Sequence, residues 1–463
     1  MKKIFSVSIL LALALAYTSC SPSEEDDLFD KSAAERLNEA SALYSSRLMA
    51  SPNGWAMQLY PTNENEYPYG NGYLLLCRFN ADHSVNVSMD NVFSDNKYLE
   101  DTSLWEVLTD NGPVLSFNSH NKCIHAFSDP EDLPFTGTSD VENIETGTGC
   151  GGDYEFIIVD APADASYMML KGKKRGAYNL LTPVEEGVTY ASYLADVKSF
   201  QKTMFSENAP TFNVIHFGDS IYKMTGANDG IPNIYPYDGD EIIDESFNAF
   251  LVTRRGDNYY LRFRDEIKLN DNVTLQEFVY NKEKDVFESV IDAQYYISGD
   301  DPVRFYQSTY DTDGIFIYGN PKYNWVFNSS SAMSDKMKGI VDQISAEFKA
   351  RNMTFSSMFF TLRKGEVSFC VSYVNKSGAT GYLYFFYDIQ NTPTGQTLSY
   401  KGYENQEYKV LELAPTLNEF ITVNMSQAFK VSAGTTAFDL NNIKLTAESD
   451  PNLWFTMKLT KMK

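Results

Sequence analysis

Short strand-like segments joined by turn residues recur along most of this 463-residue chain. Residues 73–79 and 85–89 flank the turn-forming stretch 80–83 and have the pattern of a β-hairpin. Apolar and polar residues alternate in 275–280 and 382–387, as expected where one sheet face is buried and the other meets water. Further hairpin patterns are 250–253 with 259–264, 154–159 with 168–171, and 443–447 with 453–459. The sequence therefore predicts a mainly β, α+β fold of antiparallel sheets with a few flanking helices.

Three segments with helical periodicity divide the strands into groups. The first begins with Ser32-Ala33-Ala34-Glu35, a capping box in which the serine and glutamate side chains satisfy free backbone amides. The second covers residues 190–206. In the third, apolar residues at Met337, Ile344 and Phe348 share one helix face. Because a single core rarely serves more than about 300 residues, we expect helix-led subdomains at 32–188, 189–330 and 331–463.

The first twenty residues have the pattern of a bacterial export signal. Lys2 and Lys3 precede an apolar run over residues 4–16, which is too short for a bilayer span of about 20 residues. The run leads into Tyr17-Thr18-Ser19-Cys20, which resembles the lipobox of bacterial lipoproteins. We therefore predict a signal peptide at 1–19 and lipidation of Cys20. The alternative is an ordinary cleaved signal peptide that happens to contain a cysteine.

Acidic residues dominate the remainder of the chain. Carboxylates occupy residues 24–27, and segment 20–31 has too few apolar side chains to fold, so we expect a flexible acidic tether. Asp and Glu number 62 against 38 Lys and Arg, a formal net charge of −24. A field of this sign repels phosphate backbones and makes nucleic acid a poor partner. No second segment approaches spanning length, so we predict a soluble ectodomain that contacts the membrane through its N-terminal lipid only.

No motif in the sequence assigns a catalytic residue, a cofactor or a metal. The chain lacks a His-Glu-x-x-His helix, a Gly-x-Ser-x-Gly elbow and a Walker loop. In a strand, His120 and His125 would face opposite sides, and the acidic groups at 238–245 and 311–313 lack the distal glutamate of a calcium loop. Residues 147–152 read Gly-x-Gly-x-x-Gly, but a strand follows instead of a helix, so we expect a loop with positive φ.

Aromatic side chains and one basic cluster are the candidate ligand-binding features. Tyrosines on loops and sheet edges can stack against sugar rings or anchor a partner, although sheet cores also contain many aromatics. The basic cluster at 173–175 could anchor a carboxylate or phosphate; the alternative is a solvent-exposed turn. The candidate ligand-binding residues are Tyr235, Tyr237, Tyr259, Tyr260, Lys173, Lys174 and Arg175.

The four cysteines that follow Cys20 are too few for a disulfide scaffold in a chain of this length. Cys77 and Cys370 lie in strand-like segments, where we expect small buried hydrophobic side chains. Cys123 and Cys150 lie nearer to loops, so pairing between them stays open.

Several phrases of the sequence together resemble one family of surface lipoproteins. They are Asn53-Gly54-Trp55 and residues 29–32, 34–37, 110–117, 125–130, 151–156 and 170–176. These phrases resemble the Bacteroidetes lipoprotein family catalogued as domain of unknown function 4302, most densely over residues 28–185. The resemblance implies a surface lipoprotein, often encoded near outer-membrane nutrient import systems, and supplies no catalytic residues. In such lipoproteins, an acidic stretch beside the lipidated cysteine looks like the signal for the outer leaflet.

We therefore expect a lipid-anchored protein of the bacterial outer membrane that faces the cell exterior. Our first hypothesis is a non-enzymatic accessory protein of a nutrient uptake system, which binds a glycan or peptide ligand, or an outer-membrane import complex, through aromatic side chains. One alternative is a secreted hydrolase of polysaccharide or peptide, with paired carboxylates that the sequence does not locate. The other is a structural or adhesive surface protein.

Overall fold

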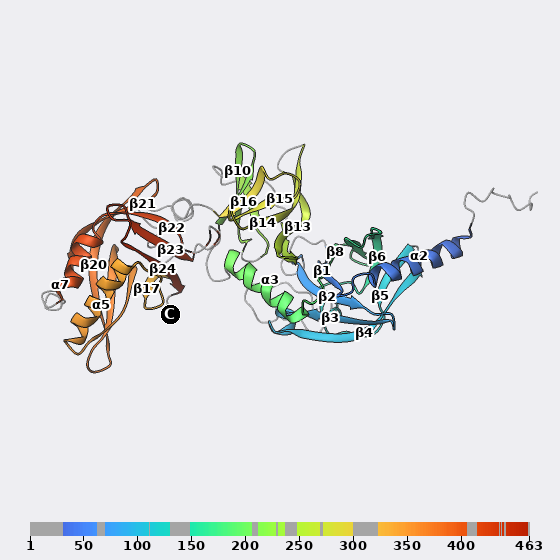
Figure 1. The fold of residues 1–463 in the computed structure, drawn as a ribbon, viewed down its shortest axis with the longest axis horizontal. Coiled ribbons are helices and arrows are strands. Elements are labelled where there is room, and N and C mark those ends of the chain that lie inside the picture. Colours follow the sequence, from blue (N-terminus) through green and yellow to red (C-terminus); the bar gives the residue numbers. More distant parts are fainter. Residues whose placement is uncertain are drawn as a thin grey trace, which may run out of the picture.

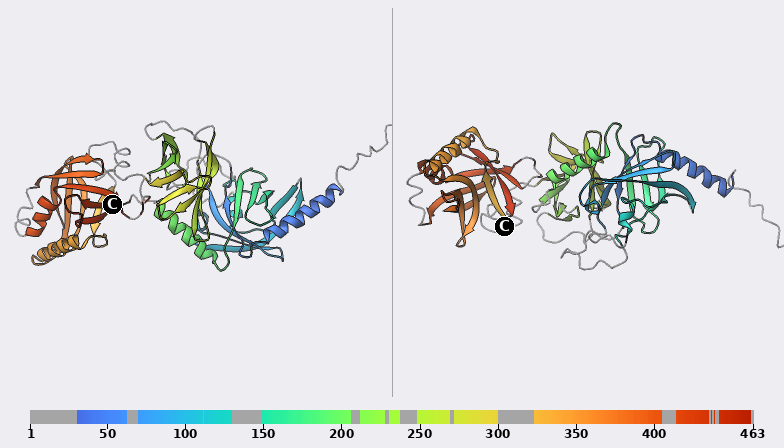
Figure 2. Two further views of the ribbon diagram at one scale, coloured as in Figure 1. Left: turned by 45° about the horizontal axis from the view of Figure 1, so that its top comes forward. Right: turned by 90° about the horizontal axis from the view of Figure 1, so that it is seen from below.

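Three antiparallel β-sheets make up most of the computed structural model. It describes residues 31–62, 70–110, 112–129, 149–205, 212–227, 230–236, 248–268, 272–299, 323–404, 414–434, 436, 438 and 441–461. Each sheet has eight strands, and four α-helices lie in the described part of the chain. Figures 1 and 2 show the three sheets following one another along the molecule. The prediction of a mainly β fold with a few helices is confirmed.

The first sheet closes into a barrel whose interior is filled by side chains. Its strands are β1 (Trp55–Leu59), β2 (Tyr73–Phe79), β3 (Ser84–Met89), β4 (Leu99–Asp110), β5 (Gly112–Phe117), β6 (Glu155–Asp160), β7 (Met168–Gly172) and β8 (Tyr178–Pro183). Pairing of β1 with β8 closes the barrel. Alternate residues, such as Trp55 and Met57, face its buried interior. Helix α2 (Ala33–Leu48) contacts β4 and β5, and the Ser41 hydroxyl donates to the Val107 carbonyl oxygen at 2.7 Å.

The second sheet is open and packs against the first barrel. In spatial order it contains β11 (Asn233–Pro236), β10 (Ser220–Thr225), β9 (Phe212–Phe217), β16 (Tyr295–Gly299), β15 (Val286–Ser289), β14 (Thr274–Asn281), β13 (Asn258–Lys268) and β12 (Phe250–Arg255). Helix α3 (Tyr190–Met204) covers one face, and the Tyr193 hydroxyl donates to the Arg254 carbonyl oxygen at 2.6 Å. Ala56 and Leu76 of the first barrel belong to the same buried cluster. The outer face of the first barrel and the second sheet therefore share one buried cluster, which is separate from the cluster inside the barrel.

The third sheet also closes into a barrel. Its strands are β17 (Tyr323–Asn328), β18 (Thr354–Arg363), β19 (Glu366–Val374), β20 (Thr380–Thr392), β21 (Gly395–Tyr403), β22 (Ala428–Ala433), β23 (Asn442–Ala447) and β24 (Trp454–Lys461). Helix α5 (Asp335–Lys349), helix α7 (Pro415–Glu419) and a π-helical turn (Phe420–Asn424) contribute Phe348, Leu417 and Phe420 to its core. Strand β17 pairs with β18 and β24, so this sheet begins before residue 331, where helical periodicity placed the boundary.

One side chain of the third barrel lies in the buried cluster of the second sheet. Phe438, on the connection between β22 and β23, is 1% exposed and belongs to the buried cluster of the second sheet. Its ring centroid lies 5.4 Å from that of Phe287 and 5.9 Å from that of Phe205. The third barrel therefore contacts the second sheet through a buried aromatic side chain.

Most local predictions agree with the structure. The capping box of α2 is present, the four predicted hairpins form, and the second helix ends at Met204. Gly149 and Gly151 have φ of +62° and +73°, as expected for their loop. Cys77 and Cys370 are buried in strands, and Cys123 and Cys150 are buried thiols that form no disulfide with one another. Cys20 and the predicted signal peptide lie outside the described residues.

Candidate functional site

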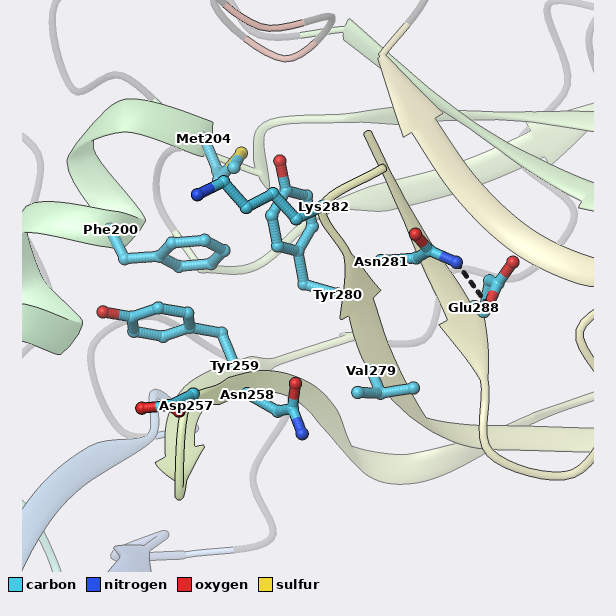
Figure 3. A pocket seen from close by; sticks show the side chains of 10 residues that line it. All are labelled: Phe200, Met204, Asp257, Asn258, Tyr259, Val279, Tyr280, Asn281, Lys282 and Glu288. Carbon is cyan, nitrogen blue, oxygen red and sulfur yellow. Dashed lines mark hydrogen bonds between the residues drawn. The ribbon is translucent and has the colours of Figure 1, made fainter. Parts of the chain in front are cut away.

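A pocket of about 620 Å³ opens where the second sheet meets the end of α3. Its lining comes from α3, from the start of β13, from the end of β14 and from β15, as Figure 3 shows. The lining residues are Phe200, Met204, Asp257, Asn258, Tyr259, Val279, Tyr280, Asn281, Lys282 and Glu288. A volume of this size lies within the range of about 300–1,000 Å³ that is typical of small-molecule sites.

Three aromatic rings form one wall of this pocket. Phe200 and Tyr259 are stacked, with ring centroids 3.8 Å apart and ring planes 1° from parallel. Tyr280 meets Phe200 edge-on at 5.1 Å. Phe200 lies three residues after Val197 on α3 and so shares its sheet-facing side. Tyr259 faces the helix because alternate β13 residues, including Leu261, face the buried core.

Part of the polar lining is engaged in hydrogen bonds within the chain. The Tyr280 hydroxyl donates to Asp285 Oδ1 at 2.7 Å, and burial, followed by this bond, raises the pKa of Tyr280. Lys284 Nζ lies 2.6 Å from Glu288 Oε1, and Asn281 Nδ2 donates to Glu288 Oε2 at 3.1 Å. These two contacts lower the pKa of Glu288 below its usual range. Glu288 is therefore held as a carboxylate.

The remaining polar lining is available to a ligand. Among the described residues, none makes a hydrogen bond or ion pair with the side chains of Asp257, Asn258 or Lys282. Asp257 and Asn258 lie beside Tyr259, and Lys282 lies near Tyr280 (Figure 3). The pocket therefore combines aromatic faces with an amide, a carboxylate and an ammonium group that can form new hydrogen bonds.

Strand alternation separates the two adjacent tyrosines that the sequence singled out. Tyr259 lines the pocket, but Tyr260 is not among the lining residues. Its side chain lies on the opposite face of the sheet, because successive residues of a strand point to opposite faces. There the Arg255 guanidinium lies 4.3 Å from the Tyr260 ring centroid and pairs with Glu277. Sequence reasoning missed Phe200 and Tyr280. Tyr280 is the last residue of the alternating segment 275–280, and an aromatic residue at the end of a predicted strand is the signal that could have identified it.

The other predicted ligand residues lie outside the pocket. Tyr235 is on β11, with Lys223 Nζ 5.5 Å from its ring centroid, and Tyr237 lies outside the described residues. Lys173 Nζ lies 3.0 Å from Asp110 Oδ2 and 2.9 Å from Glu155 Oε2.

The turn that carries the basic cluster is fixed by one carboxylate. The backbone N–H groups of Lys174 and Arg175 donate to the two oxygens of Asp153 at 3.2 and 2.8 Å. These bonds give the turn a structural role, in addition to any ligand contact that its cations make.

His120 and His125 do not lie on a strand with their side chains on opposite sides; a loop and a 3-10 turn bring their ring centroids to 5.5 Å from one another. His125 lies in a 3-10 turn (His125–Phe127), stacks on Tyr154 at 5.0 Å and accepts the Asn121 N–H at Nδ1 over 3.2 Å. Burial, followed by the nearby His120, lowers the pKa of His125. In the part of the chain that the structure describes, no group of three or more His, Cys, Asp or Glu residues could hold a metal ion.

Comparison with known proteins gives one family match. The family model described as Domain of unknown function (DUF4302) matches residues 25–282, and no curated protein matches the chain. Two similar solved structures are a DNA polymerase sliding clamp from Caulobacter crescentus and a Trp-176-Ala mutant of transferrin binding protein B from Haemophilus parasuis. The clamp is 9% identical over 91% of this chain and 98% of its own, with a TM-score of 0.14. The second is 10% identical over 89% and 75%, with a TM-score of 0.13. Scores this low carry no argument about function.

Proposed function

The chain belongs to the family Domain of unknown function (DUF4302), and we propose that it is a non-enzymatic surface lipoprotein of the outer membrane that binds a glycan for a nutrient uptake system. The proposal has two parts, a lipid anchor at the N-terminus and a glycan site in the pocket between α3 and β13–β15. Each part has its own support and its own test.

The anchor is supported by the sequence of residues 1–27. The charged start, the short apolar run, Cys20 and the acidic stretch follow the order of a lipoprotein signal and its tether. None of the helices in the described ranges is both long and apolar enough to cross a bilayer. A diacylated Cys20 would then hold the protein at the membrane, since two acyl chains give stable anchoring where one alone is marginal.

The stacked Phe200–Tyr259 pair beside unengaged polar side chains is the observation that supports a glycan ligand. A sugar ring has apolar C–H faces and a rim of hydroxyl groups. The C–H faces can pack on the pocket's aromatic rings, and the hydroxyls can bond with Asn258, Asp257 and Lys282. The pocket therefore offers both kinds of contact that a sugar requires.

The state of Glu288 argues against the alternative of a glycosidase at this site. Such an enzyme needs a carboxylic acid whose pKa is raised, so that it can protonate the leaving group. Lys284 and Asn281 do the opposite to Glu288, because both stabilise its ionised form. Binding without cleavage is the activity that this lining supports.

The test is calorimetric titration of the mature chain with maltotriose, cellotriose, mannotriose and xylotriose. Tyr259→Ala should weaken binding of the sugar that binds best by about tenfold, a loss of about 1.4 kcal/mol that is typical of one important aromatic contact. Tyr260→Ala is the matched control, since it removes the adjacent ring on the opposite face, and it should change affinity less than twofold.

Folding and product analysis complete the experiment. Thermal unfolding of both variants separates a lost contact from a lost fold, and Asn258→Ala provides a second variant with less effect on packing. Chromatography should recover the sugars intact. Absence of binding to all four sugars, or equal effects of the two tyrosine variants, would contradict the glycan pocket, whereas shortened sugars would favour the hydrolase.

A further inference from the structure

The outer face of the third barrel carries a cluster of aromatic side chains. Phe359 of β18 and Tyr382, Tyr384 and Phe386 of β20 alternate with inward residues such as Phe360 and Leu383. Tyr382 is 44% exposed, and the other three are partly exposed. We call these four residues the aromatic face; β20 is labelled in Figure 1.

Small side chains on the central strand make this face continuous. Between β18 and β20, strand β19 presents Ser368, Cys370 and Ser372 outward, and all three are buried. Cys370 pairs in register with Phe359 on one side and Tyr384 on the other. The large rings on both neighbouring strands therefore cover the small residues between them.

The rings of the aromatic face lie close enough to act together. Tyr382 and Tyr384 have ring centroids 6.2 Å apart and planes 28° from parallel. Phe359 meets Tyr382 edge-on at 6.4 Å. Two neighbouring tyrosines with similar ring orientation provide a row onto which successive planar or chair-shaped rings can stack.

The charges around the aromatic face are already paired. Arg363 Nε and Lys364 Nζ lie 3.1 and 2.5 Å from Glu404, and the Arg363 guanidinium lies 4.5 Å from the Tyr384 ring centroid. Lys401 Nζ lies 3.3 Å from Glu366 and 3.2 Å from Asp388. Three cations face three carboxylates, so this surface is locally neutral in a chain whose net charge is −24. An uncharged ligand complements such a surface better than an anionic or cationic one does.

The size of the aromatic face favours a narrow ligand over a protein partner. A fully buried aromatic residue contributes roughly 150–250 Å², and four partly exposed ones therefore offer roughly 300 Å². A stable protein interface needs about 800 Å² on each partner. A chain of neutral sugars can bind along a strip of roughly 300 Å² and does not need the area of a protein interface.

We infer that the aromatic face is a second binding site, which takes an uncharged polysaccharide chain along Tyr382 and Tyr384. It is separate from the pocket of the second sheet and stands or falls independently of it. The four residues lie outside residues 25–282, the part of the chain that the family model matches.

Affinity gel electrophoresis of the full mature chain tests the inference. The gels contain xyloglucan, galactomannan, arabinoxylan or soluble starch, with polygalacturonate as the anionic comparison. We expect at least one neutral polysaccharide to retard the protein and polygalacturonate to retard it less. The double variant Tyr382→Ala with Tyr384→Ala should weaken this retardation at least tenfold.

The matched control is Tyr178→Ala. Tyr178 is 49% exposed on the first barrel and has Lys171 Nζ 5.3 Å from its ring centroid. The Tyr178→Ala variant therefore loses a similarly exposed ring near a cation. Its retardation should equal that of the unmodified chain. If the double variant unfolds early on heating, Tyr382→Ala alone, which removes the most exposed ring, should still weaken retardation.

The results also separate this site from the pocket. Tyr259→Ala should retain polysaccharide retardation while it binds the trisaccharide about tenfold more weakly. The Tyr382 and Tyr384 variant should retain trisaccharide binding while its polysaccharide retardation is weakened. The inference is overturned if no neutral polysaccharide retards the chain, if polygalacturonate retards it as strongly, or if the Tyr382 and Tyr384 variant behaves like Tyr178→Ala.

Discussion

Replacement of Phe438 by alanine should weaken the contact between the third barrel and the second sheet. The Phe438 ring is 1% exposed and packs against Phe205 and Phe287, although its backbone belongs to the connection between β22 and β23. Removal of a fully buried phenylalanine side chain costs about 3–5 kcal/mol. Since the ring belongs to one body and its surroundings to another, most of this loss falls on their association. A loss of about 3 kcal/mol weakens the association of the third barrel with the second sheet by roughly 100-fold.

Small-angle X-ray scattering of the mature chain measures this separation directly. Phe438→Ala should increase the radius of gyration, and the third barrel should keep its own thermal transition. Phe429→Ala is the control, because Phe429 is also 1% exposed but lies in the third barrel's own core. That variant should lower the third barrel's transition temperature without expanding the folded molecule. Unchanged scattering and unchanged unfolding of Phe438→Ala would refute the reasoning.

Two further substitutions test the anchor and the shared buried cluster. Cys20→Ala should abolish incorporation of labelled palmitate and move the protein from the membrane to the soluble fraction; persistent membrane association would contradict the lipid anchor. Gly54→Ala should destabilise the protein by about 2–4 kcal/mol, because Gly54 has φ of +77° and a Cβ there would collide with the Cys77 carbonyl oxygen and the Tyr190 hydroxyl. Gly187 has φ of +81° with open space around the Cβ position. Thermal unfolding of Gly187→Ala should therefore show a smaller loss of stability than Gly54→Ala. Equal losses of stability would contradict the predicted collision at Gly54.

Local structure was predictable wherever one face of an element meets water. Strand β20 alternates between buried and partly exposed residues over 382–387, and α5 combines its apolar stripe with the N-cap serine Ser334. Strand β1 has neither signal, because all five of its residues are buried. Its inner face fills the barrel, and Ala56 on its outer face lies under the second sheet. A strand buried on both sides loses the alternation by which sequence analysis finds strands.

The candidate site was only partly predictable, because it depends on contacts between distant segments. Tyr259 was singled out as an aromatic residue near a turn, but its partner Phe200 lies on a helix in a different part of the sequence. Periodicity places Phe200 on the buried side of α3 without indicating which strand it meets. Closure of the first barrel was not predictable for the same reason, since Trp55 pairs with Pro183 across more than a hundred residues. Sequence patterns report local preferences and carry little information on such pairings.

The pairing order of the second sheet determines which fragment can carry the pocket. The family model ends at residue 282, after β14. Strand β16 pairs with β9, and β15 joins β16 to β14. Without residues 286–299, strands β9 to β11 would lose their pairing to β12 to β14, and Glu288 would be missing from the pocket. The structural unit therefore extends to at least Gly299, and a binding experiment on a fragment cut at 282 would test a broken sheet.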